Sequence, residues 1–243
     1  SGTGDITLDP NGSELIDGLS SYVMYPGETR LIMCTGTAFY SIVQTSFYRV
    51  FITTGTFYLP PGYNRIQGLI WGGGGGGAGG YGGNGGSCAP IDLQTAPLSV
   101  SYTATVGAGG AVGGDGGASS IFSIDSGWAS KGTNMGGQAG TSPYYRNPVS
   151  GVLPPNRLMS GTNLSQPVYA DYGGGTGSNV AGTITNLAHS IFGGGGGVPS
   201  GIAGSSVFGG QGGVGAGNGT APGGGGGSTG AGARGEIRIW GVI

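Results

Sequence analysis

Two segments of the chain alternate polar and apolar residues, and each one adjoins a run of glycines. Arg65–Trp71 leads directly into the first run, and Glu236–Ile243 leaves the last one. Alternation with a period of two is typical of a half-buried β-strand. A flexible spacer needs no matched strands at its two ends, so the pattern predicts that the glycine runs are folded segments held by a sheet.

Shorter strands are predicted before this region. The expected strands are Ile6–Leu8, Tyr22–Tyr25, Thr29–Cys34 and Ala38–Val43, with turns at Asp9–Gly12 and Pro26–Gly27. Proline fixes φ in such turns, and Asn-Gly tolerates the left-handed region. Glu14–Gly18 is expected to be a tight connection and Thr53–Tyr63 a strand, a turn and a second strand. Residues 1–45 are too few to bury a large core alone, which suggests association with copies of the same chain.

Glycine accounts for 63 of the 243 residues, and most of it follows Trp71. Such tracts usually form flexible linkers, so order needs a physical reason. An extended polyglycine helix has three residues per turn and a rise of about 3.1 Å, and its N–H and C=O groups all point outward. Buried backbone groups need partners. Neighbouring glycine helices can supply them, because no Cβ keeps the backbones apart.

The expected fold is therefore mainly β with little or no α-helix, with strands framing a packed bundle of polyglycine II helices. Ordering each residue costs about 1–2 kcal/mol of backbone entropy, and glycine lies at the worse end. Only a dense lattice of such helices offsets that cost. Gly74, Gly195 and Gly225 are predicted structural glycines. The first run lies within Trp71–Gly83, and the others are Gly107–Gly117, Gly173–Gly177, Gly193–Gly197, Gly209–Gly219 and Gly223–Gly232.

Composition narrows the possible functions. Charged residues make up 7% of the chain, the net charge is −2 and Lys131 is the only lysine, so nucleic-acid binding is not expected. The aromatic residues argue against disorder. No apolar run is long enough to cross a bilayer, and membrane insertion is not expected. Cys34 and Cys88 fit no metal or redox spacing and are expected to be free thiols.

Candidate catalytic and metal-ligating residues are few. His189 is the only histidine, so no histidine-based metal cluster or catalytic triad closes within one chain. Carboxylates that could in principle pair for glycoside hydrolysis are Asp92, Asp115, Asp125 and Asp171, but the sequence does not give their distances. We expect no metal, no cofactor and no enzymatic activity.

Three segments of the N-terminal part form a recognisable pattern: Ile6–Gly18, Tyr25–Glu28 and Thr35–Tyr40. Together they resemble a small β-module of tailed-bacteriophage tail fibres, which often comes just before the fibre tip. Cys34 and Ala38-Phe39 depart from the usual version, which has an aspartate and an asparagine–tryptophan pair in the last segment. The family is typically trimeric, so the resemblance implies a homotrimer that joins other tail-fibre proteins.

Five further landmarks follow in order. They are Gly55–Gly62, Ile66–Gly77, Thr105–Gly110, Gly116–Phe122 and Gly223–Ile243. This order resembles the glycine-rich domain of phage tail fibres and related surface proteins, over most of residues 48–243. Tip adhesins of this kind are understood to use a sandwich of polyglycine helices whose connecting loops contact the host receptor. Receptor ectodomains of the anaplastic lymphoma kinase group also contain glycine-rich helices, but nothing else in the chain resembles them.

The segments between the landmarks are rich in proline, tyrosine, serine and asparagine, which is the composition of loops and of antibody binding sites. The longest is Asp125–Asp171, and Ser87–Leu98, Asn179–Phe192 and Val198–Phe208 are shorter. Tyrosine supplies contact area at low entropic cost, and arginine adds directional hydrogen bonds. The candidate receptor-binding residues are Tyr144, Tyr145, Arg146, Tyr169 and Tyr172; packing within their own loops is the alternative for each.

The sequence thus predicts a phage tail-fibre tip with a short β-module at residues 1–47 and a glycine-rich receptor-binding domain at residues 48–243. The expected function is adhesion to a bacterial surface receptor, either a polysaccharide or an outer-membrane protein. The expected location is the tail fibre of a virion, after synthesis in the host bacterial cytoplasm. A fibre-borne polysaccharide depolymerase or esterase and a purely structural fibre segment are the alternatives.

Overall fold

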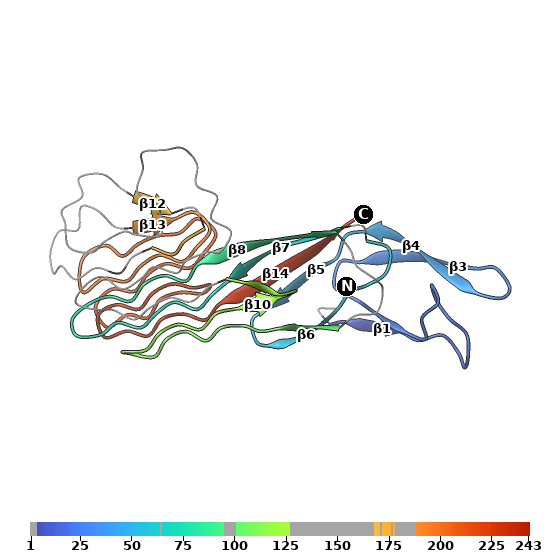
Figure 1. Ribbon diagram of the computed structural model, residues 1–243, viewed down its shortest axis with the longest axis horizontal. Coiled ribbons are helices and arrows are strands. Elements are labelled where there is room, and N and C mark those ends of the chain that lie inside the picture. The colour runs from blue at the N-terminus through green and yellow to red at the C-terminus, as the bar shows by residue number, and fades with distance from the viewer. Residues whose placement is uncertain are drawn as a thin grey trace.

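The computed structural model describes residues 4–63, 65–94, 101–126, 168–170, 172–175, 177 and 188–243. These residues form strands and loops and contain no helix, which confirms the mainly β prediction. None of them therefore forms a helix that could span a membrane. In Figure 1 the glycine runs fill one end of an elongated molecule, and the strands fill the middle and the other end.

The first seven strands are β1 (Ile6–Leu8), β2 (Tyr22–Met24), β3 (Thr29–Cys34), β4 (Phe39–Thr45), β5 (Tyr48–Phe51), β6 (Gly55–Tyr58) and β7 (Arg65–Trp71). The remaining strands are β8 (Cys88–Gln94), β9 (Ser101–Ala104), β10 (Ser120–Ile121), β11 (Ile124–Asp125), β12 (Val168–Ala170), β13 (Ala188–Ser190) and β14 (Glu236–Val242).

The central sheet joins the two ends of the glycine-rich region. Its order is β5-β14-β7-β8, and β14 pairs antiparallel with β7 along its whole length, from Trp71 opposite Glu236 to Arg65 opposite Val242. The two segments that alternate in the sequence are thus direct neighbours. Their alternation matches burial, because Ile66 and Ile70 of β7 and Ile237 and Ile239 of β14 lie in the core.

An aromatic cluster fills the core beside this sheet. Phe57 lies at its centre, and its ring stacks on Tyr25 with 5.2 Å between centroids. The rings of Phe47 and Tyr63 meet edge to face at 4.9 Å. Gly241 makes room for these two rings, because a Cβ there would overlap both. Tyr25 comes from the segment before residue 48, so the core crosses the predicted domain boundary. That boundary stays a prediction.

Three segments expected to be loops contain strands. Cys88–Gln94 lies within Ser87–Leu98 and forms β8, which pairs with β7 over all seven of its residues. Its proline, Pro90, is tolerated because β8 is an edge strand of the sheet. β12 and β13 pair in parallel and also lie in segments of loop composition. Conversely, Thr53–Tyr63 was expected to hold two strands but contains one, β6, which pairs with β9.

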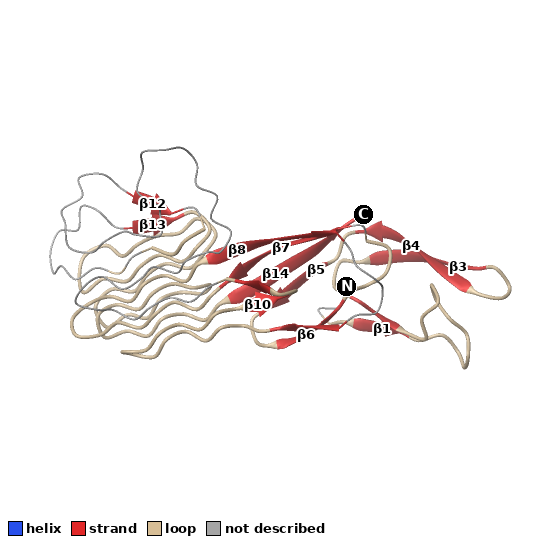
Figure 2. Ribbon diagram, in the orientation of Figure 1, coloured by secondary structure: helices blue, strands red, loops and turns tan. Residues whose placement is uncertain are grey.

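Hydrogen bonds between the glycine runs follow a period of three. Gly72 and Gly75 donate to Ser87 and Asn84 of the returning run, at 2.9 Å each. Gly73 and Gly76 donate to Gly117 and Gly114, at 2.8 and 2.9 Å, and Gly74 and Gly77 donate to Ala233 and Gly230, at 2.8 and 2.9 Å. One run therefore bonds to three different neighbours in rotation. Figure 2 draws these runs as tan loops lying side by side.

The three predicted structural glycines all lie in this tightly packed part. A Cβ on Gly74 would fall on the carbonyl oxygen of Gly224, and one on Gly195 on that of Gly204. A Cβ on Gly225 would fall on the carbonyl oxygen of Gly83. Each approach is closer than 3.0 Å, which real Cβ atoms essentially never show. Backbones at this separation exclude every side chain.

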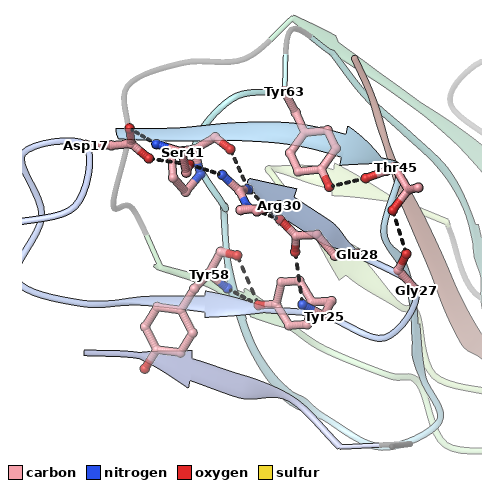
Figure 3. A network of polar contacts seen from close by, with 10 residues as sticks. Asp17, Tyr25, Gly27, Glu28, Arg30, Ser41, Thr45, Tyr58 and Tyr63 are labelled. Atoms are coloured by element: carbon pink, nitrogen blue, oxygen red, sulfur yellow. Dashed lines mark hydrogen bonds and ion pairs between the residues drawn. The ribbon is translucent and has the colours of Figure 1, made fainter. Parts of the chain in front are cut away.

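A buried ion pair connects the N-terminal strands to the core (Figure 3). Arg30 Nη2 lies 2.5 Å from Glu28 Oε1, and the two side chains are 1% and 0% exposed. Arg30 also donates to Ser41 Oγ at 2.8 Å and to the Pro61 carbonyl at 2.6 Å. A buried charge is tolerated only when such bonds compensate for lost hydration. The network therefore fixes how β3 and β4 leave the core.

The first prediction concerns the glycine packing. Gly74→Val and Gly195→Val should each lower the free energy of unfolding by more than about 3 kcal/mol or prevent folding, because the backbone of a neighbouring run occupies the site of the new side chain. Thermal melting measures the effect. Gly4→Val is the control, because nothing lies within 4 Å of a Cβ built there. Wild-type melting of both glycine-run variants would contradict the packing.

The second prediction concerns alkaline pH. Burial raises the pKa of the Tyr25 hydroxyl from 10.0 to about 12. Between these values the folded chain keeps a proton that the unfolded chain has lost, so stabilisation by neutral Tyr25 is complete below pH 10.0 and is lost as the pH rises towards 12. Tyr25→Phe should flatten this fall in denaturant unfolding curves. It should also cost about 1 kcal/mol at neutral pH, because the hydroxyl donates to the Tyr58 carbonyl and accepts from the Tyr58 N–H.

The control for this experiment is Tyr48→Phe, which changes an exposed tyrosine on β5. Its stability should fall with alkaline pH as steeply as that of the wild type. Equal slopes for Tyr25→Phe and the wild type would show that titration of Tyr25 does not govern alkaline stability.

Candidate functional site

The structure describes only part of the predicted receptor-binding set. Tyr144, Tyr145 and Arg146 lie outside the described residues. Tyr169 lies in β12, opposite His189 of β13. Tyr172 is half-buried, and its carbonyl oxygen accepts a hydrogen bond from the Cys88 N–H at 2.7 Å. Tyr172 is thus attached to the edge of the central sheet, and receptor contact by all five residues stays a prediction.

Three aromatic rings form a ladder on the glycine bundle. Tyr172 stacks on Phe192 with 4.7 Å between centroids and 8° between planes. Phe192 stacks on Phe208 with 5.0 Å and 11°. Each ring immediately precedes a glycine run, at Gly173, Gly193 and Gly209 respectively. Stacked aromatic rings add about 0.5–1.5 kcal/mol per pair beyond burial.

The ladder aligns the runs that follow it. A Cβ on Gly193 would meet the carbonyl oxygen of Gly173, and one on Gly209 would meet that of Gly193, so the three runs start side by side. Tyr172 was among the residues predicted from the sequence, whereas Phe192 and Phe208 were not. A usable signal was present, because each aromatic residue directly precedes a glycine run. For Tyr172 the ladder provides a packing role in addition to the predicted receptor contact.

The turns at the far end of the bundle lie together. Gly113 N donates to Gly77 O at 2.8 Å, Gly77 N to Gly230 O at 2.9 Å, and Thr229 N to Gly215 O at 3.1 Å. Glycines with positive φ make these turns possible, among them Gly79, Gly113 and Gly215. Val112 and Val214 are 57% and 42% exposed there. Val112 and Val214 therefore project from glycine-rich turns at this end.

Within the described residues, His189 and Ser205 form a candidate base–nucleophile pair. His189 Nδ1 lies 2.7 Å from Ser205 Oγ and also accepts from the Ser205 backbone N–H at 3.1 Å. Because a backbone N–H donates to Nδ1, the neutral ring carries its proton on Nε2. Nδ1 is therefore an acceptor that faces a serine hydroxyl, which is the first requirement for activating a serine.

Of the predicted carboxylates, Asp92 lacks the environment of a general acid. Asp92 is exposed and paired with Arg65, whose hydrogen bonds hold the pKa of Asp92 below its usual range. A general acid for glycoside hydrolysis needs the opposite shift. Asp171 lies outside the described residues. Among the residues described, no three histidine, cysteine, aspartate or glutamate side chains are grouped so that they could hold a metal ion.

The two cysteines differ in environment. Cys34 is exposed at the end of β3, and Cys88 is buried in β8. Burial raises the pKa of the Cys88 thiol well above its ordinary value, which disfavours the reactive thiolate. Both are free thiols, as the sequence predicted.

The third prediction tests the aromatic ladder. Phe192→Ala removes the middle ring and both stacking contacts, and it should lower the free energy of unfolding by about 2 kcal/mol. Phe208→Ala removes an end ring that is 48% exposed, and it should cost about half as much. Thermal melting of both variants measures the ratio. Equal losses would show that the rings act independently and do not align the runs.

Comparison with known proteins gives one family. A family model described as a glycine-rich domain matches residues 52–239, which is most of the chain. A search of curated proteins found no match.

Proposed function

We propose that this chain, which belongs to the glycine-rich domain family, is the receptor-binding tip of a bacteriophage tail fibre. Its function is adhesion to a receptor on the bacterial surface. Two features support this proposal. The N-terminal segments Ile6–Gly18, Tyr25–Glu28 and Thr35–Tyr40 resemble a tail-fibre module, and the glycine-rich landmarks follow in the order known from tail-fibre proteins.

The glycine runs are, in this proposal, polyglycine II helices. The supporting observation is the rotation of hydrogen bonds through three neighbours, which repeats when Gly72, Gly73 and Gly74 give way to Gly75, Gly76 and Gly77. A helix with three residues per turn directs residues i and i+3 to the same side. An isolated strand would direct alternate residues to two sides instead.

The observation that carries the proposed function is that the glycine runs bind one another through their backbones. Their N–H groups donate to neighbouring runs, and glycine has no side chain with which to recognise a ligand. Recognition must then come from the segments between the runs, as is common for loops on rigid scaffolds. In the proposal Tyr144, Tyr145, Arg146, Tyr169 and Tyr172 supply it. A surface polysaccharide or an outer-membrane protein is the receptor.

The proposed setting is a virion. The chain assembles as a homotrimer with other tail-fibre proteins after synthesis in the bacterial cytoplasm. Three copies bind a cell surface with avidity, so a modest affinity per site suffices for attachment.

A second candidate function is hydrolysis of a surface polysaccharide or of its esters. The specific observation in its favour is the Ser205–His189 pair at 2.7 Å. Release of sugars or acids from purified surface polysaccharide, abolished by Ser205→Ala, would establish this activity and displace simple adhesion. A purely structural fibre segment is the third candidate; exchange of the loops would then leave host range unchanged.

The fourth prediction tests adhesion. The triple variant Tyr144→Ala, Tyr145→Ala and Arg146→Ala should fold normally and adsorb poorly to cells that bind the parent chain. A hot-spot residue contributes about 2 kcal/mol or more, which is roughly thirtyfold in affinity for each site. The measurement is sedimentation of a fluorescent-protein fusion with bacterial cells, with and without their surface polysaccharide.

The control for adhesion is the double variant Asn156→Ala and Arg157→Ala, which removes one positive charge from the same long segment. It should adsorb like the parent. If the triple variant, and a matching one at Tyr169 and Tyr172, also adsorb like the parent, the receptor site lies elsewhere in the chain.

A further inference from the structure

Asparagine followed by glycine occurs three times in the chain, at Asn11, Asn84 and Asn218. This pair is chemically labile, because the backbone nitrogen of the second residue can close a five-membered ring on the side-chain amide of the first. Glycine has no side chain to hinder the closure, and its backbone rotates more freely than that of any other residue. Since the reacting groups are the same in all three pairs, the surroundings of each pair decide whether it reacts.

Asn84 is held inside the glycine bundle. It is 1% exposed, and its Oδ1 accepts a hydrogen bond from the Gly177 N–H at 2.7 Å. The N–H that would attack, on Gly85, donates to the Gly175 carbonyl at 2.8 Å. Both reacting groups are therefore bonded to another run. Ring closure requires the bundle to open, and openings of packed regions approach the cost of global unfolding.

Asn218 is exposed, but its reacting groups are also bonded. Its Oδ1 accepts from the Ala231 N–H at 2.9 Å, and the Gly219 N–H donates to the Ala231 carbonyl at 2.9 Å. A Cβ on Gly219 would fall on the Gly224 carbonyl oxygen, so the backbone has little room to rotate. Two hydrogen bonds must therefore break before a ring closes at Asn218.

Asn11 has none of these restraints. It lies in the exposed turn that follows β1, towards the end of the molecule opposite the glycine bundle (Figure 1). Within the described residues, neither the Asn11 side chain nor the Gly12 N–H makes a hydrogen bond. The Asn11 carbonyl accepts from the Glu14 N–H at 3.2 Å, which closes a turn with Gly12 at a φ of 63°. Nothing lies within 4 Å of a Cβ built on Gly12, so its backbone has room to rotate.

We propose that the Asn11-Gly12 turn is a site of spontaneous deamidation, which converts Asn11 to aspartate and isoaspartate in the folded chain. The Gly12 nitrogen forms a bond to Cγ of Asn11, and the bond from Cγ to Nδ2 breaks. The amide group leaves as ammonia with the proton from the Gly12 N–H, and a five-membered imide remains. One water molecule then opens the ring. Cleavage at Cγ gives aspartate, and cleavage at the main-chain carbonyl carbon gives isoaspartate.

The conversion changes the charge and the backbone of the N-terminal part. Each event adds one negative charge to a chain whose net charge is −2. In the isoaspartate form the main chain is longer by one methylene group in the segment that joins β1 to β2. Asn11 lies outside the hydrophobic core, so converted chains stay folded and accumulate with time. The inference goes beyond the proposed adhesion and does not rest on it.

The test follows the intact wild-type chain in mildly alkaline buffer, which favours loss of the proton from the attacking nitrogen. Trypsin then separates two sites, because Asn11 is the only asparagine in residues 1–30 and Asn84 the only one in residues 66–131. Asn218 is assigned by fragmenting its own peptide. Mass spectrometry measures the fraction converted at each site.

Asn11 should convert roughly thirtyfold faster than Asn218, because two hydrogen bonds must first break at Asn218. Asn84 should not convert while the chain is folded. In guanidinium chloride all three sites should convert at similar rates, because only the fold distinguishes them. Equal rates at Asn11 and Asn218 in the folded chain overturn the proposal. An undiminished lead of Asn11 in denaturant does so too, because the fold would then play no part.

The variant for this test is Asn11→Gln, which keeps an amide but would need a six-membered ring. Residues 1–30 contain no other asparagine or glutamine, so the mass of this peptide should stay constant. The matched control, Asn218→Gln, should leave conversion of Asn11 unchanged. Conversion of Asn11→Gln at the wild-type rate contradicts ring closure. A wild-type product with aspartate but no isoaspartate contradicts it as well, because direct hydrolysis by water passes through no ring.

Discussion

The structure depends on hydrogen bonds between glycine backbones. Each run places its N–H groups on carbonyl oxygens of several neighbours, with donor–acceptor distances mostly of 2.7–2.9 Å. These bonds form only when the backbones lie closer than any side chain permits. The lattice therefore works only as a whole: an isolated run would lose the most backbone entropy of any sequence on ordering and would gain no partners.

The central sheet makes such a lattice possible in a single chain. The first glycine run follows β7, and the last run precedes β14. Because β7 and β14 pair residue by residue, the two ends of the glycine-rich region are held side by side. The aromatic ladder repeats this on a smaller scale, because the stacked rings of Tyr172, Phe192 and Phe208 align the starts of three runs. Strand pairing and ring stacking thus align the starts of the glycine runs. Backbone hydrogen bonds then keep the runs aligned along the stretches that have no side chains.

The two ends of the molecule differ in what they offer to partners. The glycine-rich end presents turns with positive-φ glycines, and in the proposed function the segments between the runs supply the specificity there. The opposite end presents the β3–β4 hairpin, on which Leu31, Met33, Tyr40 and Ile42 are exposed and the Arg30–Glu28 pair is buried. This polarity suits the proposed fibre tip, in which copies join at one end and the other end meets a receptor.

The sequence by itself determined the elements whose signals are local. Period-two alternation located β7 and β14, and turn residues separated the short strands from Ile6 to Val43. Composition and the order of landmarks indicated the glycine-rich family. The sequence also singled out Gly74, Gly195 and Gly225, although the reason that they exclude side chains lies in runs distant in the chain.

Only the tertiary structure decided the features that depend on neighbours. Pro90 made Cys88–Gln94 resemble a loop, and its strand exists because β7 offers an open edge. Tyr25 of the N-terminal part joined a core built by later residues, since burial is shared across the chain. Phe192 and Phe208 gained their role from stacking, and Arg30 of β3 is buried only because Glu28 and the Pro61 carbonyl bind it. Local pattern specifies which strand forms; packing decides which face it hides and which it leaves for a partner.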